Sequence, residues 1–237
     1  MLDRKPAAER KNHSMSLRYK CVVLDHDDTV VDSTPMIHHP AYVRYMEKHP
    51  RDAPILDLQH WFLMLWEQGY TEYLKSLHLT DEERVEENAM WKEFAQTKHP
   101  KMFPGMLELL TEFKQLGGLL CVCSHSYPEA ITRHYSELTD GKLTPDMVFG
   151  LELGEEHLCK PSPYPIHRII ERYRLLPEDI VVIDDMKPGF EMAQRAGVDA
   201  VGVTYGAGHE LVVDRFPEFC KYIVSSVDGL RPILFSA

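Results

Sequence analysis

The sequence predicts a doubly wound α/β fold, that is, a Rossmann-like parallel sheet covered by helices, with an inserted α-helical domain. Three observations lead to this prediction. Short apolar runs alternate along the chain with segments of helical pattern. Most of these runs are almost continuously apolar, which is typical of parallel strands covered on both faces. The alternation is interrupted once, by a long segment without a convincing strand.

The predicted core elements follow one another in a regular order. The strands are expected at 20–24, 119–123, 147–151, 180–183, 199–203 and 221–224. The helices between them are expected at about 106–116, 127–137, 164–174 and 188–196. This strand–helix rhythm indicates a single parallel sheet with helices packed on it.

The interruption spans residues 33–103 and is predicted to be helical. Thr34 and Pro35 have the residue types of an N-cap and a first helical position. Pro40 must then kink or restart that helix, because its ring removes a backbone N–H. We therefore expect a first helix that begins near residue 34.

Two further helices are predicted within the insertion. Residues 57–69 place apolar side chains at helical spacing, and Thr80 opens a capping box that ends at Glu83 and starts a helix through about 97. Four large side chains are interpreted as the core of the insertion rather than as a substrate cage. They are Trp61, Phe62, Leu65 and Trp66.

The chain is thus divided into a basic tail, a core and the insertion. The tail is 1–15, the core is formed by 16–32 and 104–237, and the insertion is 33–103. The length of 237 residues allows a core with one smaller inserted domain. Residues 1–20 carry six basic and two acidic side chains, and the whole chain has a formal charge of −11. The tail is therefore expected to be solvated.

Composition excludes several classes of function. A strongly acidic body is a poor general binder of nucleic acid, because no positive field attracts the phosphate backbone. No run approaches the roughly 18 apolar residues of a membrane span, and the N-terminal residues lack the apolar stretch of a secretory signal. Five cysteines without a dense framework favour reduced thiols and a cytoplasmic protein. Cys121 and Cys123 are interpreted as small buried residues of a strand.

Polar side chains follow several of the predicted strands. In open α/β sheets, ligands bind beyond the carboxyl ends of the strands, so these side chains are expected to meet at one edge. A lysine in a Lys-Pro-Ser-Pro loop ahead of a helix joins them. The residues concerned are Asp25, Asp27, Ser124, Lys160, Asp184 and Asp185.

These residue types favour phosphoryl transfer. Asp25 and Asp27 can face the same side, and two adjacent carboxylates need either a shared proton or a cation between them. With the acids at 184–185 added, the oxygen-rich set suits Mg²⁺. Lys160 supplies a compact positive charge and Ser124 supplies a hydroxyl donor. A carboxylate nucleophile, a hard cation and these donors together predict a phosphoryl-transfer site.

In these motifs the chain resembles the haloacid dehalogenase superfamily, which consists mostly of Mg²⁺-dependent phosphohydrolases. The four family motifs occur in order. They are D-x-D-x-T at 25–29, a strand that ends in Ser124, Lys-Pro-x-Pro from Lys160, and the acid pair at 184–185. The general pattern is phosphoglycolate-phosphatase-like, with a helical cap between the first and second motifs at the position of 33–103.

The resemblance implies a role for each matching position. Asp25 would be the nucleophile that forms an aspartyl-phosphate, and Asp27 would protonate the leaving oxygen and then activate water. Lys160 would assist at the phosphoryl group. The implied metal ligands are Asp25, Asp27 through its backbone carbonyl, Asp184 and Asp185. The implied phosphate-binding residues are Ser124, His125, Lys160, Asp28 and Thr29.

Three positions depart from the family pattern. Asp28 stands where glycine is common, His125 stands where asparagine is common, and Pro188 stands where an acid is common. His26 and His125 lie beside the predicted site and can bind substrate or tune it. His38 or His39 can also face the cleft, because the insertion starts near the site.

The resemblance leaves the outcome of the reaction open. A small-molecule phosphatase that acts on a phosphorylated metabolite is the leading interpretation. A phosphomutase of the β-phosphoglucomutase type would use the same motifs. A carbon–halogen hydrolase needs neither metal nor a second aspartate, so Asp27 and the acid pair argue against it, and intact motifs argue against an inactive binding module. We expect a monomer or weak dimer.

Overall fold

A six-stranded parallel sheet forms the centre of the computed structural model, which describes residues 15–151 and 156–236. The spatial order of its strands is β6-β5-β2-β7-β8-β9. The strands are β2 (Cys21–Leu24), β5 (Leu119–Cys123), β6 (Met147–Phe149), β7 (Ile180–Asp184), β8 (Asp199–Val203) and β9 (Tyr222–Val224). All six predicted strands are present, so the predicted α/β fold is confirmed. The predicted tail lies outside the described residues, apart from Met15.

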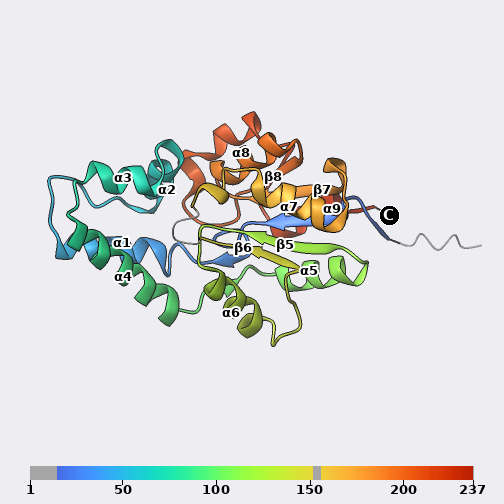
Figure 1. Ribbon diagram of the computed structural model, residues 1–237, viewed down its shortest axis with the longest axis horizontal. Helices are drawn as coiled ribbons and strands as arrows, with labels where there is room; N and C mark the ends of the chain where they lie inside the picture. Colours follow the sequence, from blue (N-terminus) through green and yellow to red (C-terminus); the bar gives the residue numbers. More distant parts are fainter. Residues whose placement is uncertain (1–14, 152–155, 237) are drawn as a thin grey trace, which may run out of the picture.

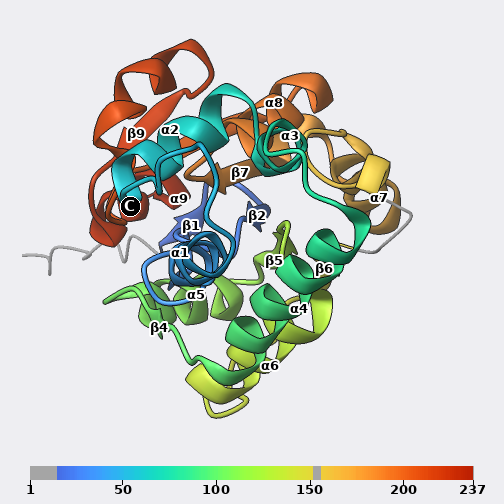
Figure 2. The same ribbon diagram turned by 90° about the vertical axis from the view of Figure 1, so that its left-hand side faces the viewer.

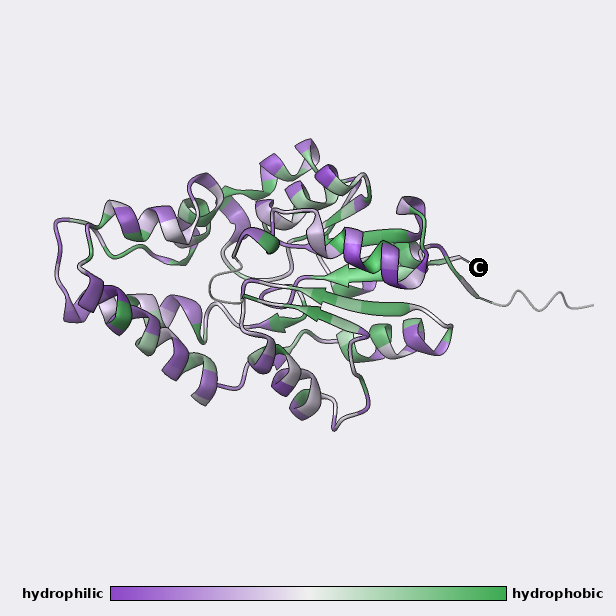
Figure 3. Cartoon of the chain, viewed as in Figure 1, coloured by the Kyte–Doolittle hydropathy of each residue, from purple (hydrophilic) through white to green (hydrophobic). Residues whose placement is uncertain are grey.

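Helices cover both faces of this sheet (Figure 1). They are α5 (Met106–Gln115), α6 (Pro128–Leu138), α7 (Tyr164–Tyr173) and α8 (Lys187–Ala196). Val22 and Leu24 belong to the hydrophobic cluster that contains α5 and α6, whereas Cys21 and Val23 belong to the cluster that contains α7 and α8. Successive strand residues point to opposite faces, so an all-apolar strand packs on both sides. Figure 3 shows the hydrophobic character of the sheet.

The sheet order places β2 in the middle, with β5 on one side and β7 on the other. The chain therefore runs outward from β2 in two directions. The carboxyl ends of these three strands meet at this switch point, which is where open α/β sheets bind ligands. Cys121 and Cys123 on β5 are buried in the α7–α8 cluster, as predicted.

Smaller elements complete the core. Two short strands near the ends of the chain pair antiparallel, β1 (Ser16–Leu17) with β10 (Phe235–Ser236). The remaining helix is α9 (Arg231–Leu234). The 3₁₀ helices are η1 (Glu156–Leu158), η2 (Pro177–Asp179), η3 (His209–Leu211), η4 (Val213–Glu218) and η5 (Val227–Leu230).

The insertion forms four helices at one end of the molecule, beyond the sheet (Figures 1 and 2). They are α1 (His38–Lys48), α2 (Leu58–Glu67), α3 (Tyr70–Ser76) and α4 (Asp81–Thr97). These helices share a hydrophobic cluster of their own, which includes Tyr45, Trp61, Phe62 and Met90. Where the chain leaves and re-enters the core, β3 (Val31–Asp32) pairs with β4 (Lys101–Met102). The sequence pattern did not predict α3 or β4.

The starts of two helices test the capping predictions. The capping box of α4 is present: Thr80 Oγ1 accepts a hydrogen bond from the Glu83 backbone N–H at 3.2 Å, and Glu83 Oε2 accepts one from the Thr80 N–H at 2.9 Å. The predicted start of α1 near Thr34 is wrong, because residues 34–37 form a turn and the helix begins at His38. Pro40 then lies in its first turn, where a missing N–H is tolerated.

The interpretation of Trp66 is also wrong. Trp61 and Phe62 are buried in the insertion and Leu65 packs beside them, as predicted, but all three also line a cavity between the insertion and the sheet edge. Trp66, however, belongs to the α7–α8 cluster of the core, where it stacks on Phe216 with ring centroids 5.5 Å apart. Side chains of α2 therefore pack both in the insertion and in the core, so this helix joins the two.

Membrane insertion finds no support in the helices. Within residues 15–151 and 156–236, none of them has both the length and the apolar character that spanning a bilayer requires.

Candidate active site

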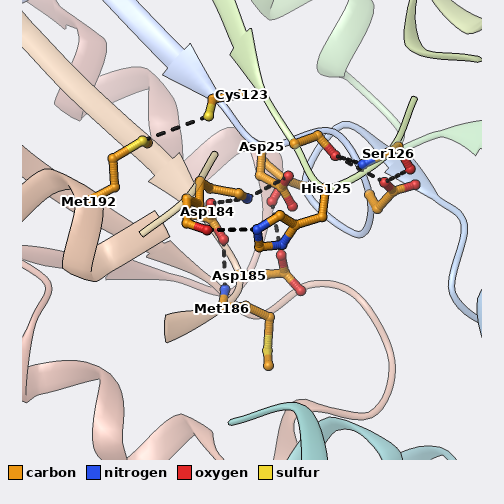
Figure 4. Close-up of polar contacts among 12 residues, drawn as sticks. Asp25, Cys123, His125, Ser126, Asp184, Asp185, Met186 and Met192 are labelled. Carbon is orange, nitrogen blue, oxygen red and sulfur yellow. Dashed lines mark hydrogen bonds and ion pairs between the residues drawn. The ribbon is translucent and has the colours of Figure 1, made fainter. Parts of the chain in front are cut away.

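Three buried aspartates meet at the carboxyl end of the sheet. Asp25 follows β2, Asp184 ends β7, and Asp185 comes next in the chain. One carboxylate oxygen from each lies within 4.8 Å of the others (Figure 4). Their exposed fractions are 6%, 0% and 2%. The parallel register of β2 and β7 brings the two strand ends together, so residues distant in sequence form one group.

Lys160 joins two of these acids. Its Nζ donates to Asp25 Oδ1 and to Asp184 Oδ2, each at 2.8 Å, and all three side chains are buried. Burial alone would lower the pKa of Lys160, but the two carboxylates outweigh it and raise this pKa well above its usual range. Lys160 is therefore a permanent cation. The predicted convergence of this loop with the strand ends is present.

The acid group still carries more negative charge than one lysine offsets. Burial raises the pKa of Asp184 to about 7, although Lys160 opposes the shift. Burial together with the charges of Asp25 and Asp184 raises the pKa of Asp185 well above its usual range. Buried, crowded oxygen ligands of this kind are what a hard divalent cation such as Mg²⁺ prefers. The residues present fit such an ion.

Asp27 lies apart from this group. Its Oδ1 accepts a hydrogen bond from Ser33 Oγ at 2.7 Å, and its Oδ2 accepts from Ser126 Oγ at 2.6 Å and from Ser124 Oγ at 3.2 Å. Three hydroxyl donors stabilise the ionised form of the carboxylate. The side chain of Asp27 is thus held separately from the aspartates that can share a cation.

A histidine of the insertion also reaches Asp27. His38 Nε2 lies 3.1 Å from Asp27 Oδ1, without an aligned hydrogen bond. Burial alone would raise the pKa of Asp27, but His38 and the hydroxyl donors hold it well below its usual range. The Trp91 indole N–H donates to His38 Nδ1 at 2.8 Å, so the proton of the neutral ring is on Nε2, facing Asp27. His39, in contrast, donates to the Leu56 carbonyl.

The predicted phosphate-binding residues divide into two sets. Asp28, Ser124, His125 and Lys160 line a cavity between the sheet edge and the insertion. His125 Nε2 donates to the Lys160 backbone carbonyl at 2.8 Å, which ties the β5 loop to the lysine loop. Thr29 is instead fully buried and does not line the cavity, and its Oγ1 lies 3.4 Å from Asp185 Oδ1.

Asp28 occupies the position where the family pattern has glycine. Its backbone φ is +57°, a left-handed conformation that aspartate tolerates better than most residues. Its Oδ1 accepts from the Thr34 backbone N–H at 3.1 Å, and burial together with the nearby Asp185 raises its pKa to about 7. Asp28 therefore ties the loop after β2 to the start of the insertion.

His26 does not face the cavity. Arg133 can only donate, so the hydrogen bond from its Nη2 leaves His134 Nδ1–H to donate to His26 Nε2 at 2.9 Å. Burial lowers the pKa of His26, with the neighbouring aspartates opposing the shift. The side chain is therefore a neutral part of the core behind the site.

Sequence reasoning missed several residues of this site, among them His209 and the Ser33 and Ser126 hydroxyls that donate to Asp27. His209, on η3, is buried, and its Nε2 lies 2.7 Å from Asp185 Oδ2. Its Nδ1 donates to the Gly206 carbonyl at 3.1 Å. Phe62 of α2 packs on the His209 ring at 4.3 Å between centroids. No spacing motif singles out this histidine, because its contacts come from elements far apart in the chain.

The cavity above these residues has a volume of about 410 Å³. Its floor is formed by the loops after β2, β5 and β7, and its opposite wall is formed by the helices of the insertion. A cavity with buried acids and one buried cation at its floor can hold a small polar ligand.

Comparisons with known proteins agree with this architecture. A family model described as haloacid dehalogenase-like hydrolase matches residues 19–197. The chain is 28% identical over 122 residues to a phosphoglycolate phosphatase of Mannheimia succiniciproducens. The matched region covers 50% of this chain and 52% of that protein. The chain thus spans about half the length of this curated relative. It is 26% identical over 198 residues to a phosphorylated carbohydrates phosphatase of Thermotoga maritima, which covers 81% and 87% respectively.

Solved structures show the same fold. A haloacid dehalogenase-like hydrolase from Bacteroides fragilis superposes with a TM-score of 0.72 at 24% identity, over 90% of this chain and 100% of that chain. A haloacid dehalogenase-like protein from Agrobacterium tumefaciens gives a TM-score of 0.73 at 16% identity, over 91% and 97% respectively. At these identities the likeness concerns the fold alone.

Proposed function

Because the chain belongs to the haloacid dehalogenase-like hydrolases, we propose that it is a Mg²⁺-dependent phosphohydrolase that releases phosphate from a small phosphorylated metabolite. The reaction would pass through an aspartyl-phosphate on Asp25. One observation carries the proposal: Lys160 bridges Asp25 and Asp184 at 2.8 Å each, at the floor of a cavity that the insertion closes. The names of the curated relatives, which are phosphatases, support the same chemistry.

The metal would be held by residues that already lie together. Asp25, Asp184 and Asp185 supply the carboxylates, and the backbone carbonyl of Asp27 is the remaining protein ligand that the family resemblance implies. When bound, Mg²⁺ polarises the phosphoryl oxygens and offsets their charge. The high pKa values of the acids at 184–185 mean that cation binding competes with protons there.

Asp25 is placed to act as the nucleophile. One of its carboxylate oxygens attacks phosphorus, the ester P–O bond breaks, and the leaving oxygen departs on the opposite side. Lys160 donates a hydrogen bond to Asp25 and offsets the repulsion between the carboxylate and the phosphoryl group. Ser124 and the lysine donate to the transferring phosphoryl oxygens.

Asp27 is placed to act first as a general acid and then as a general base. Its hydroxyl partners and His38 keep the resting carboxylate ionised, and the arrival of a negative phosphoryl group raises its pKa because like charges repel. Asp27 takes up a proton from solvent as the ester binds and then gives it to the leaving oxygen, which forms the alcohol. The same carboxylate next takes a proton from the water that attacks the aspartyl-phosphate, which releases phosphate and regenerates Asp25.

The insertion would act as the cap over this chemistry. It supplies His38 next to Asp27 and one whole wall of the cavity. Excluding water strengthens each electrostatic contact at the floor and shields the phosphoryl intermediate from solvent. The remaining predictions stand with this proposal: a cytoplasmic protein, a monomer or weak dimer, and no nucleic-acid or membrane partner.

The test is phosphate release from a generic aryl phosphate, with Mg²⁺ and with chelator. We expect turnover that requires the cation and is lost in Asp25→Asn, while the exposed acid variant Asp140→Asn behaves as wild type. Activity that persists in Asp25→Asn with unchanged folding would refute the assignment of the nucleophile. Turnover that resists the chelator would refute the metal. Transfer of phosphate between two positions of a sugar, with slow net release, would indicate a mutase instead.

A further inference from the structure

The wall of the cavity opposite the phosphoryl site has an unusual composition. It is rich in aromatic side chains contributed by the insertion: Tyr42, Trp61, Phe62, Tyr70 and Trp91. Among the described residues that line the cavity, the insertion supplies no lysine or arginine, and Lys160 at the floor is the only such cation. The insertion does supply two carboxylates, Glu72 and Glu87.

The titratable groups of this wall are not equivalent. Glu72 is mostly exposed and pairs with Lys75 at 2.6 Å, so it belongs to the rim. His38 lies against the Asp27 carboxylate, with its Nε2 3.1 Å from Asp27 Oδ1, so its partner is that acid at the floor of the cavity. Glu87 is therefore the group that decides the charge of the wall.

Glu87 is buried and only half satisfied. It is 8% exposed, and its Oε1 accepts a hydrogen bond from the Tyr70 hydroxyl. No described residue donates to its second carboxylate oxygen, although the side chain faces the cavity. Burial raises the pKa of Glu87, and the Tyr70 hydrogen bond opposes the shift. The second carboxylate oxygen can accept a hydrogen bond from a ligand in the cavity.

We propose that Glu87 selects phosphate esters whose alcohol portion carries a hydrogen-bond donor, above all an ammonium group, and no negative charge. An ammonium that faces the free oxygen of Glu87 gains a charge-assisted hydrogen bond. The aromatic rings that line the same cavity favour a cation over an anion through their quadrupoles. The acid and the aromatic residues are separate observations, and both favour the same chemistry.

The same wall disfavours an anionic alcohol portion. A carboxylate placed there would meet aromatic rings and Glu87, and no lysine or arginine of the insertion among the described lining residues would pair with it. The selection therefore runs against phosphoglycolate, the substrate in the name of a curated relative. This inference rests on the proposed phosphohydrolase, because it names the substrate class of that cavity.

Three esters of similar size test how the charge on the alcohol portion affects turnover. Phosphoglycolate, 2-hydroxyethyl phosphate and 2-aminoethyl phosphate carry a negative, a neutral and a positive group at matching positions. We expect kcat/KM to be highest for the amine, intermediate for the alcohol, and lower for phosphoglycolate than for the amine by a factor of about ten or more. Equal or better turnover of phosphoglycolate would overturn the inference and leave the phosphohydrolase intact.

Substitution of Glu87 tests the residue itself. Glu87→Gln should remove the preference for the amine over the alcohol, and Glu87→Lys should invert the series in favour of phosphoglycolate. Glu82→Gln, an exposed position on the same helix, should keep the wild-type order. An unchanged order in both Glu87 variants would show that Glu87 does not select.

A binding measurement keeps the two proposals distinguishable. Titration calorimetry of the three esters with Asp25→Asn needs no turnover. We expect the same order of affinities as in the kinetics. Ordered affinities without any turnover by the wild type would refute the proposed function and leave the selection by charge standing. Phosphoglycolate binding as tightly as the amine would refute the selection.

Discussion

His209 Nε2 lies 2.7 Å from Asp185 Oδ2, in a contact where both side chains are about 97% buried. The Nδ1–H of His209 donates a hydrogen bond to the Gly206 carbonyl, and this bond fixes the orientation of the ring. The His209 ring also packs against Phe62 of the insertion. One histidine therefore positions an acid of the proposed metal site and carries the contact of α2 on the core.

The first prediction concerns this histidine. His209→Phe keeps an aromatic ring for Phe62 but removes the partner of Asp185, so the carboxylate loses its orientation. We expect Mg²⁺ affinity to weaken by about 10–100-fold, the usual effect of losing a hydrogen-bond partner behind a metal ligand. The measurement is the Mg²⁺ concentration for half-maximal phosphate release. His167→Phe, at an exposed position of α7, is the control, and equal Mg²⁺ requirements would contradict the positioning role.

A second prediction concerns Gly189, in the first turn of α8. A Cβ at this position would overlap the carboxylate of Asp184. Gly→Ala in a helix interior ordinarily stabilises by about 1 kcal/mol, but here Asp184 must leave Lys160 and the Met186 N–H, from which it accepts at 2.9 Å. We expect Gly189→Ala to destabilise by roughly 1–3 kcal/mol.

Urea unfolding and phosphate release measure the effect of this change. Activity should be lost together with stability, because the same displacement removes a proposed metal ligand. Gln194→Ala, at an exposed position of the same helix, should change neither quantity by much. A stabilised and active Gly189→Ala would show that the close approach to Asp184 is not required.

Buried His134 makes stability depend on pH. Burial lowers its pKa to about 4, and the Arg133 guanidinium, which donates to its Nε2, adds to the shift. The unfolded pKa is about 6.5. The contribution of His134 to the unfolding free energy is therefore complete above about pH 6.5 and is lost as the pH falls toward 4. Over this range the imidazole is protonated in the unfolded chain but stays neutral in the folded protein.

His134→Gln isolates this contribution. We expect the unfolding free energy of the wild type to fall by up to about 2 kcal/mol more than that of the variant between pH 7 and pH 4.5. Urea unfolding at a series of pH values measures the difference. Parallel curves for the two proteins would mean that His134 accepts a proton in the folded state as readily as in the unfolded one.

The capping box of α4 supplies a prediction about the insertion. Thr80→Ala removes the acceptor for the Glu83 N–H, so we expect a loss of about 1 kcal/mol. Thr80→Ser keeps the hydroxyl and should remain close to wild type. Denaturant unfolding compares the two variants, and equal midpoints would contradict a capping contribution.

Local patterns predicted much of the molecule because their causes are local. The all-apolar strands reflect burial on both faces, which each strand signals by itself, as β5 at Leu119–Cys123 illustrates. The capping box at Thr80 needs only residues three positions apart. The rule that ligands bind beyond parallel strand ends then predicted that Asp25 and Asp184 would meet.

Other features depend on contacts between distant segments. Trp61 and Trp66 both lie on α2, yet Trp66 packs in the core because of the position of α2 against it. The start of α1 at His38 follows from a turn that Asp28 ties to the Thr34 N–H. Neither contact leaves a periodic signal, so the pattern alone predicted these two positions wrongly.

The sequence by itself determined the order of the strands of the sheet and the residue types at each strand end, since hydrophobic periodicity acts along the chain. Only the tertiary structure decided that His209 supports Asp185, that His38 rather than His39 reaches Asp27, and that Glu87 faces the cavity with one oxygen free. Those relationships arise from the docking of α2 and α4 over the sheet edge, where packing between segments far apart in sequence sets which side chains become neighbours.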